Sequence, residues 1–389
     1  MAESAFEAHP GLSPRWREVA ADEPLLSSVP WLTMRAPKAD GEATTFLVSS
    51  ATTGTPIAGM FTVTADGGVA DPAFDVRELL TGSPRTLMPG RAHSTLAVGG
   101  GEAGSWYPHL VVAYPGYESY VAGPGRSSPG IVDELVDGIV EWSRSNGHKA
   151  VAFLYTVPGQ PHLEAALARR GFIRLEVTAT CDLVLPGDTF DDYLATLPRK
   201  RRTEVRRERR VLTARGVTTR PAALADVFDD LVRLRLNHAA RYGRKVSEEK
   251  ERARLTALVE RFGEGHVLVF VATAQSEHDT LAFSVVLDHR GEWYVLDSGA
   301  DYDNPLHVLT YFDACYYVPI ETAYDRGVGV LHYSLGSWDA KRYRGCTLVP
   351  RDGWVLPLTA ELRDLLDHGG VGSLVLVDEP QDTPAAAVE

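Results

Sequence analysis

The sequence is poor in cysteine and lacks long apolar runs, and each shortage excludes a class of protein. Its three cysteines, Cys181, Cys315 and Cys346, are widely spaced, and none belongs to a C-x-x-C pair. This argues against a disulfide framework or a zinc ribbon and fits a reducing compartment. No stretch approaches the roughly 18 apolar residues of a membrane-spanning helix. The first residues show no basic segment followed by an apolar run, so we expect a cytoplasmic protein without a secretory signal.

Negative charge is in excess, but the charges are unevenly distributed along the sequence. The formal net charge is −13, and an acidic surface repels phosphate, which disfavours a protein broadly coated with nucleic acid. Residues 199–215 nevertheless hold nine basic and two acidic residues, a local charge of +7. This concentration predicts one localised anionic partner.

The length of 389 residues and an apolar content of 44% indicate two domains with buried cores. Strand-like runs and helical spacing alternate in both halves. In the first half, strands are expected at residues 44–51, 57–65, 109–114, 150–157 and 175–187, and helices at 131–145 and 162–172. In the second half, helices are expected at 189–197, 199–215, 226–242, 248–262 and 306–326, and strands at 266–274, 280–289, 292–300 and 329–336.

This order predicts the α/β (α+β) class, with a mixed sheet flanked by helices in each half. We expect a lead-in over residues 1–43, with Trp16 and Trp31 as anchors on the first domain. The two domains are then expected at 44–186 and 187–360. A tail over 361–389 is expected to be partly disordered, because its end, DEPQDTPAAAVE, is polar and rich in Pro and Ala.

Two segments carry the most specific motifs. The first is FDDYLATLPRKRR at residues 190–202, which continues to Arg210 and is followed by Gly216-Val217. The second is YFDACYYVPIETAYDRG at 311–327, followed by HYSLGSWDAKRYRG at 332–345. The second pair is similar to the acidic-Cys-Tyr-Tyr, Ile-Glu and Gly-x-x-x-x-Lys-x-x-Arg-Gly run of the FemAB-like, peptidoglycan-biosynthesis family of the GNAT superfamily. The first looks like the start of that family's second domain.

The resemblance implies two tandem GNAT-like domains and transfer of an acyl or aminoacyl group to an amine. One departure stands out. Pro319 lies inside the expected helix 306–326, where it removes a hydrogen bond and should kink the helix.

Acyl transfer to an amine passes through a tetrahedral oxyanion, which requires a nearby cation or donor and an acceptor for the amine's proton. The resemblance points to Lys341 and Arg344 as the cations. Tyr317 and Glu321 are four residues apart on a helix and therefore share one face, where Glu321 could accept the proton or hold the amine. The catalytic candidates are thus Lys341, Arg344, Tyr317 and Glu321. Solvated loop charges and a structural Tyr–Glu pair are the plain alternatives.

The substrate-binding candidates are Asp297 and Ser298, at a strand end beside a glycine, together with Tyr316, Trp338 and His238. The plain alternatives are a simple turn and a structural histidine. The scattered His and Cys residues lack the spacing of a metal site, and we expect neither a metal nor a resident cofactor. The sequence also lacks a G-x-S-x-G elbow and a Walker loop, so hydrolase and kinase functions have no support.

The basic segment offers several binding functions. In a helix, the arginines Arg199, Arg202, Arg206, Arg209 and Arg210 fall largely on one face. Such a face can hold tRNA phosphates, the phosphates of a nucleotide-linked acceptor, or anionic lipid headgroups. It can equally be a solvated helix that pairs with acidic neighbours.

The sequence of residues 300–307 bears on whether the acyl donor is acyl-CoA or aminoacyl-tRNA. The resemblance implies a glycine-containing pyrophosphate loop here if the donor were acyl-CoA. This stretch has no glycine pair, and two aspartates would repel pyrophosphate. We therefore favour an N-acyltransferase that uses aminoacyl-tRNA and a cell-wall or natural-product amine. The alternatives are an acyl-CoA-dependent GNAT N-acetyltransferase and a non-catalytic protein that binds nucleic acid or a membrane surface. The oligomeric state and the transferred group stay open.

Overall fold

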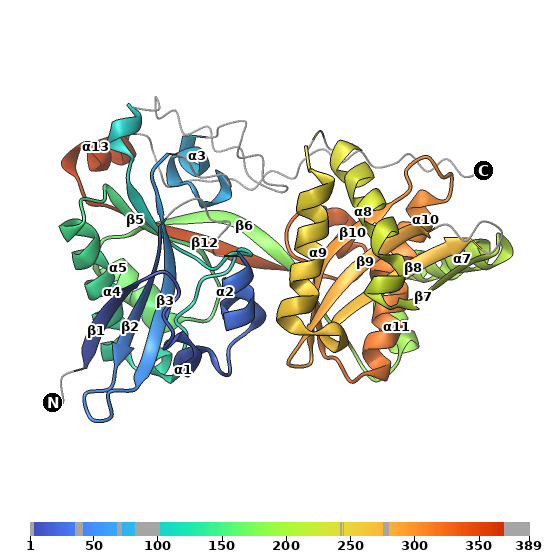
Figure 1. Ribbon diagram of the computed structural model, residues 1–389, viewed down its shortest axis with the longest axis horizontal. Helices are drawn as coiled ribbons and strands as arrows, with labels where there is room; N and C mark the ends of the chain where they lie inside the picture. The colour runs from blue at the N-terminus through green and yellow to red at the C-terminus, as the bar shows by residue number, and fades with distance from the viewer. Residues whose placement is uncertain are drawn as a thin grey trace. The chain divides into compact units, whose positions relative to one another are not determined.

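The computed structural model describes residues 4–35, 42–67, 72–81, 102–241, 243, 245–274 and 280–368 (Figure 1). The chain divides into two compact units. Unit 1 contains Met1–Thr180, Leu335–Ser337 and Val349–Glu389, and unit 2 contains Cys181–Ser334 and Trp338–Leu348. The described residues nearest to both ends of the chain therefore belong to unit 1.

Unit 1 is a mixed sheet with the strand order β1-β2-β3-β4-β5-β12-β6. Its strands are β1 (Ala5–Pro10), β2 (Ala43–Ser49), β3 (Pro56–Ala65), β4 (His109–Val112), β5 (Ala150–Thr156), β6 (Ile173–Val184) and β12 (Thr347–Pro357). Its helices are α1 (Trp16–Ala20), α2 (Val29–Arg35), α3 (Val76–Thr81), α4 (Pro129–Ser145), α5 (Pro161–Arg169) and α13 (Ala360–His368). The β4–β5 pair is parallel, and β5–β12 is antiparallel.

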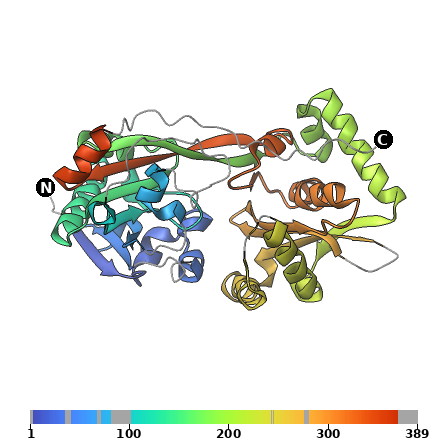
Figure 2. The same ribbon diagram turned by 90° about the horizontal axis from the view of Figure 1, so that it is seen from above.

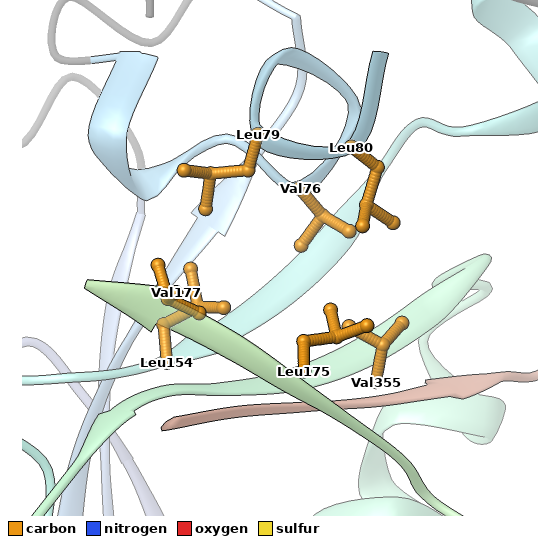
Figure 3. Close-up of a pocket in the computed structure, with 7 residues that line it drawn as sticks. All are labelled: Val76, Leu79, Leu80, Leu154, Leu175, Val177 and Val355. Carbon is orange, nitrogen blue, oxygen red and sulfur yellow. The ribbon is translucent and has the colours of Figure 1, made fainter. Parts of the chain in front are cut away.

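Side chains of β5 alternate between two cores, as a sheet covered on both faces requires. Val151 and Phe153 face the core that α4 and α5 cover. Ala152 and Leu154 face the core with α3 and α13. Figure 3 shows seven apolar side chains of this second core around a gap of about 10 Å³, which is no larger than one water molecule needs. This gap is a packing defect and not a ligand site.

The strand order in unit 2 is β6-β11-β10-β9-β8-β7, to which β6 contributes only its last residues, 181–184. Its strands are β7 (Val217–Ala222), β8 (Val267–Ala274), β9 (Thr280–His289), β10 (Glu292–Ala300) and β11 (Val330–His332). Its helices are α6 (Phe190–Thr196), α7 (Arg199–Ala214), α8 (Leu224–Arg241), α9 (Glu248–Phe262), α10 (His307–Phe312), α11 (Val318–Asp325) and α12 (Trp338–Arg342). Helices α8 and α9 cover one face of the sheet, and α10 and α11 cover the other (Figure 2).

Helices α10 and α11 are joined by a π-helical turn, η8 (Asp313–Tyr317). Pro319 has no N–H, so carbonyl groups one turn earlier lose a donor within the helix. Side chains from elsewhere replace it. Ser284 Oγ donates to Ala314 O at 2.7 Å, and Tyr333 OH donates to Cys315 O at 3.2 Å. The kink expected at Pro319 thus takes the form of a widened turn just before it.

The predicted class, with a mixed sheet flanked by helices in each half, is confirmed. The expected lead-in contains three elements that were not predicted, β1, α1 and α2, and its Trp16 and Trp31 are buried as expected of anchors. Residues 349–360 were expected in the second domain, but pairing of β12 with β5 puts them in unit 1. Residues 361–368 of the expected tail belong to α13, and residues 369–389 lie outside the described residues.

Candidate functional site

Lys341 lies on α12, inside the Lys-x-x-Arg-Gly motif, and its side chain is buried. Its Nζ donates to the carbonyl oxygens of Tyr333, at 2.6 Å, and Ser334, at 3.2 Å. Only 7% of the residue is exposed, and burial lowers its pKa to about 8. The alternative of a solvated loop charge is therefore wrong for this residue. The ammonium holds the chain just after β11.

Arg344 is the most unusual group of this region. It is 3% exposed, and its Cζ lies 3.1 Å from the centroid of the Phe312 ring and 5.3 Å from that of Tyr316. Nη1 donates to Ala340 O at 2.7 Å. Nε has no hydrogen-bond partner, and no carboxylate pairs with the guanidinium within the described part of the chain. A buried arginine normally has such a partner, because desolvation of its charge is costly.

Four tyrosines surround this cation. Tyr193 OH donates to Arg344 O at 3.1 Å, and the rings of Tyr316 and Tyr333 stack with their centroids 4.5 Å apart. Burial raises the pKa of Tyr193, Tyr316, Tyr317 and Tyr333, and the nearby Arg344 charge opposes that rise. The phenols therefore stay neutral at ordinary pH. They provide hydroxyl groups and ring faces but no negative charge.

Tyr317 is held by α7. Its hydroxyl accepts a hydrogen bond from Arg201 and donates to Glu208 Oε2 at 2.9 Å. Arg201 is buried and also pairs with Glu208 at 2.8 Å. This role of Arg201 is not predicted from its charge. Arg201, Val205 and Leu212 are spaced as one inward-facing stripe of the helix, and all three are buried.

Glu321 is already engaged. Arg209 donates to both of its carboxylate oxygens, at 2.6 and 2.8 Å, and the Nε of Arg209 lies 3.3 Å from Asp313. These bonds hold the carboxylate of Glu321 against α7. Tyr317 and Glu321 thus share one helix but serve two different arginines of α7. The geometry favours positioning roles for both.

Asp297 and Ser298 lie where β10 runs on beyond its pairing with β11, which ends at Tyr294. A bulge between Val295 and Asp297 turns Asp297 inward. Its carboxylate contacts Arg254 and lies 3.0 Å from Arg235 Nε. Burial raises the pKa of Asp297, and these two arginines oppose the rise.

The remaining substrate candidates have separate neighbours. Ser298 Oγ lies 3.2 Å from Tyr311 OH. His238 Nδ1 lies 2.6 Å from Tyr302 OH. Trp338 is buried at the start of α12. Residue 242, the end of the helix expected at 226–242, lies outside the described residues.

The basic helix forms as predicted, and its arginines divide into groups. Arg202 donates to Ala195 O and Leu197 O and so completes the end of α6. Arg199 is exposed at the start of α7. A pocket of about 380 Å³ is lined by Thr189, Phe190, Asp191, Leu194, Val205, Arg206, Arg209 and Glu321. An adjoining hollow is lined by Arg206, Arg209, Arg210 and Thr213.

The residues that the structure describes contain no group of three His, Cys, Asp or Glu side chains able to hold a metal ion. Nor does any helix among them have the length and apolar character required to cross a membrane.

A family model described as peptidoglycan biosynthesis/recognition, FemAB-like, matches residues 97–367, more than half of the chain. The chain belongs to the FemAB-like family. Both the Lys341–Arg344 segment and α7 lie inside the matched range. Membership supports a peptidoglycan-related acyltransferase. No curated protein sequence matches the FemAB-like chain.

Among solved structures, the FemAB-like chain is similar to FemX, with a TM-score of 0.61 and 11% identity over 93% of this chain and 100% of that one. At this identity the likeness shows a shared fold. A tandem GNAT protein from the clavulanic acid biosynthesis pathway matches with a TM-score of 0.48 and 12% identity, over 91% and 98% of the two chains. The C-terminal domain of a putative lysylphosphatidylglycerol synthetase from Agrobacterium fabrum matches with 0.47 and 13%, over 69% and 85%.

Proposed function

We propose that this FemAB-like protein transfers an aminoacyl group from aminoacyl-tRNA to an amine of a cell-wall precursor or a related natural product. The observation that carries the proposal is Arg344, a buried cation with no carboxylate partner in the described part of the chain. The rings of Phe312 and Tyr316 offset part of the desolvation cost. A negative charge that forms during the reaction would offset the rest.

The reaction places that negative charge on an oxygen. The acceptor amine attacks the ester carbonyl of the donor, a C–N bond forms, and the carbonyl oxygen becomes an oxyanion. The ester C–O bond then breaks, and the proton lost by the amine goes to the departing hydroxyl of the tRNA. We assign the Arg344 guanidinium to the oxyanion. Lys341 is assigned to positioning, because its ammonium is bound to the carbonyl groups of Tyr333 and Ser334.

Two features support tRNA as the donor. Arg206 and Arg210 are exposed on α7, where they can contact phosphates. The stretch before α10 carries Asp301 and Asp303, and α10 is a helix of only six residues. This stretch lacks the glycine pair that a pyrophosphate loop of the acyl-CoA type would need.

The donor is tested by incubating the protein with charged tRNA or with labelled acetyl-CoA, each with candidate amines. We expect product from charged tRNA, and RNase treatment should abolish its formation. Product from acetyl-CoA that resists RNase would instead establish the acyl-CoA-dependent alternative.

The site is tested with Arg344→Met. We expect a loss of turnover of about 100-fold or more, the effect of removing one oxyanion donor, with an unchanged circular dichroism spectrum. Arg342→Met is the matched control, because Arg342 is 60% exposed on the same segment. Full turnover in Arg344→Met would contradict the proposal. If wild type gave no product with either donor and bound only RNA, the protein would be a non-catalytic binder.

A further inference from the structure

The pocket between α6, α7 and α11 has an aromatic floor. Phe190 is the first residue of α6, where Thr189 forms a capping box with Asp192. Phe190 is partly exposed, and it lines the pocket together with Leu194 and Val205. The cap fixes the start of the helix, and the Phe190 ring packs with its centroid 5.4 Å from that of Tyr193. A fixed, accessible ring in a concave site is a stacking surface for a planar group.

One cation lies over the Phe190 ring and is fixed in place. The Cζ of Arg209 lies 5.4 Å from the centroid of Phe190, and the pairing with Glu321 and Asp313 holds its guanidinium. The carboxylates of Glu321 and Asp313 already neutralise the charge of Arg209. Arg209 therefore lines the pocket but binds an added anion only weakly.

Two other cations are available at the rim. Arg206 is 58% exposed, and its contact with Asp191 at 3.3 Å joins it to a side chain that is itself 83% exposed. Such a surface pair is weak and easily exchanged. Arg210 is exposed, and its Nε donates to Arg206 O, which directs the side chain back along α7. Both arginines line the adjoining hollow.

We propose that this pocket is a nucleotide subsite, in which a base stacks on Phe190 and a phosphate binds Arg206 and Arg210. The proposal rests on the proposed function and deepens it, because it assigns the single-stranded end of the donor tRNA to a named place. A nucleotide-linked acceptor carries the same chemistry and is the other source of such a ligand. A pocket of about 380 Å³ accommodates a base with its sugar.

The test uses calorimetric titration of the full chain with a short single-stranded RNA and, separately, with uridine diphosphate. We expect the RNA to bind, and Phe190→Leu to weaken it about tenfold, the loss typical of one stacked base. Arg206→Gln should also weaken binding. Arg207→Gln is the matched control, because Arg207 is exposed on the same helix but lines neither the pocket nor the hollow. Circular dichroism checks the fold of each variant.

Binding of uridine diphosphate that depends on Phe190, without RNA binding, would support the subsite and identify the acceptor as its occupant. Equal affinity of wild type and Phe190→Leu for both probes, or equal weakening by Arg206→Gln and Arg207→Gln, would overturn the subsite. RNase-sensitive turnover is measured on the same variants. If it persists while the subsite fails, the proposed function stands alone.

Discussion

At the scale of single residues, the buried cations of the Lys-x-x-Arg-Gly segment differ in how they are held. Lys341 donates to two backbone carbonyl groups, whereas Arg344 lies against aromatic rings. Carbonyl groups stabilise an ammonium only in part, so burial leaves the Lys341 pKa at about 8. This has a measurable consequence for stability.

The folded state releases the Lys341 proton near pH 8, whereas the unfolded chain keeps it up to about pH 10.4. Between these values the unfolded state binds more protons, so the contribution of Lys341 to stability rises with pH, by at most about 1.4 kcal/mol per pH unit. We expect the unfolding free energy of wild type to rise relative to that of Lys341→Met between pH 8 and 9.5, measured by urea unfolding. The comparison cancels the ionisation of all other groups, which both proteins share. Lys200→Met, at a side chain that is 86% exposed, should show no such trend. A relative loss for wild type would disprove the assignment.

Glu321 offers a second test at this scale. If it were the general base, Glu321→Gln would reduce turnover by about 100-fold or more. Because Arg209 already holds it, we expect turnover to fall only a few fold, with a loss of about 0.5–1 kcal/mol in unfolding free energy for a pair whose side chains are 33% and 36% exposed. Steady-state kinetics and urea unfolding measure the two effects. A large loss of turnover without a change in stability would restore the catalytic role.

At the scale of elements, the widened turn η8 shows how one proline is accommodated. Ser284→Ala should leave the carbonyl of Ala314 buried without its donor, at a cost of about 1–3 kcal/mol. Thr322→Ala is the control, since its hydroxyl only bonds back to Val318 O within α11. Thermal unfolding of both variants checks the difference. Equal losses would show that the Ser284 bond has no special role.

Elements with clear end signals could be predicted from the sequence. Pro198 and Gly216 mark the ends of α7, expected at 199–215 and found at Arg199–Ala214. Strand β12 was missed because Pro350 and Gly353 read as turn residues, and only a bulge between Asp352 and Trp354 allows the strand to continue. Its partner β5 lies far away in the sequence, and local patterns carry no information about such pairing.

The candidate site was predictable to a similar degree. The resemblance selected Lys341 and Arg344, but burial and carbonyl binding of Lys341 depend on the path of β11. Arg209 pairs with Glu321, which lies 112 positions away in the sequence, and local patterns do not reveal such a contact. The predicted phosphate-binding face therefore included an arginine that already has a carboxylate partner. Phe190 lay within a quoted motif, but nothing in the sequence marked its ring as exposed.

At the scale of the whole molecule, a local charge of +7 on a chain of −13 predicts RNA binding that is strong only at low salt. Replacing both Arg206 and Arg210 with Gln should reduce the slope of log affinity against log salt by about 0.7, the value for one single-strand phosphate contact. Arg144→Gln, at a 55% exposed side chain of unit 1, is the control. Titrations at several salt concentrations measure the slope. An unchanged slope would place the phosphate contacts elsewhere.

The late position of β12 in the chain affects folding during synthesis. Unit 2 ends at Leu348, so a ribosome completes its sequence before β12 can insert between β5 and β6. Until then the nascent unit 1 has two unpaired strand edges, which are sites of aggregation. We expect a released fragment that ends at Leu348 to protect unit 2 from protease while its unit 1 residues are digested. Limited proteolysis of this fragment would reveal the order, and protection of its unit 1 residues would refute it.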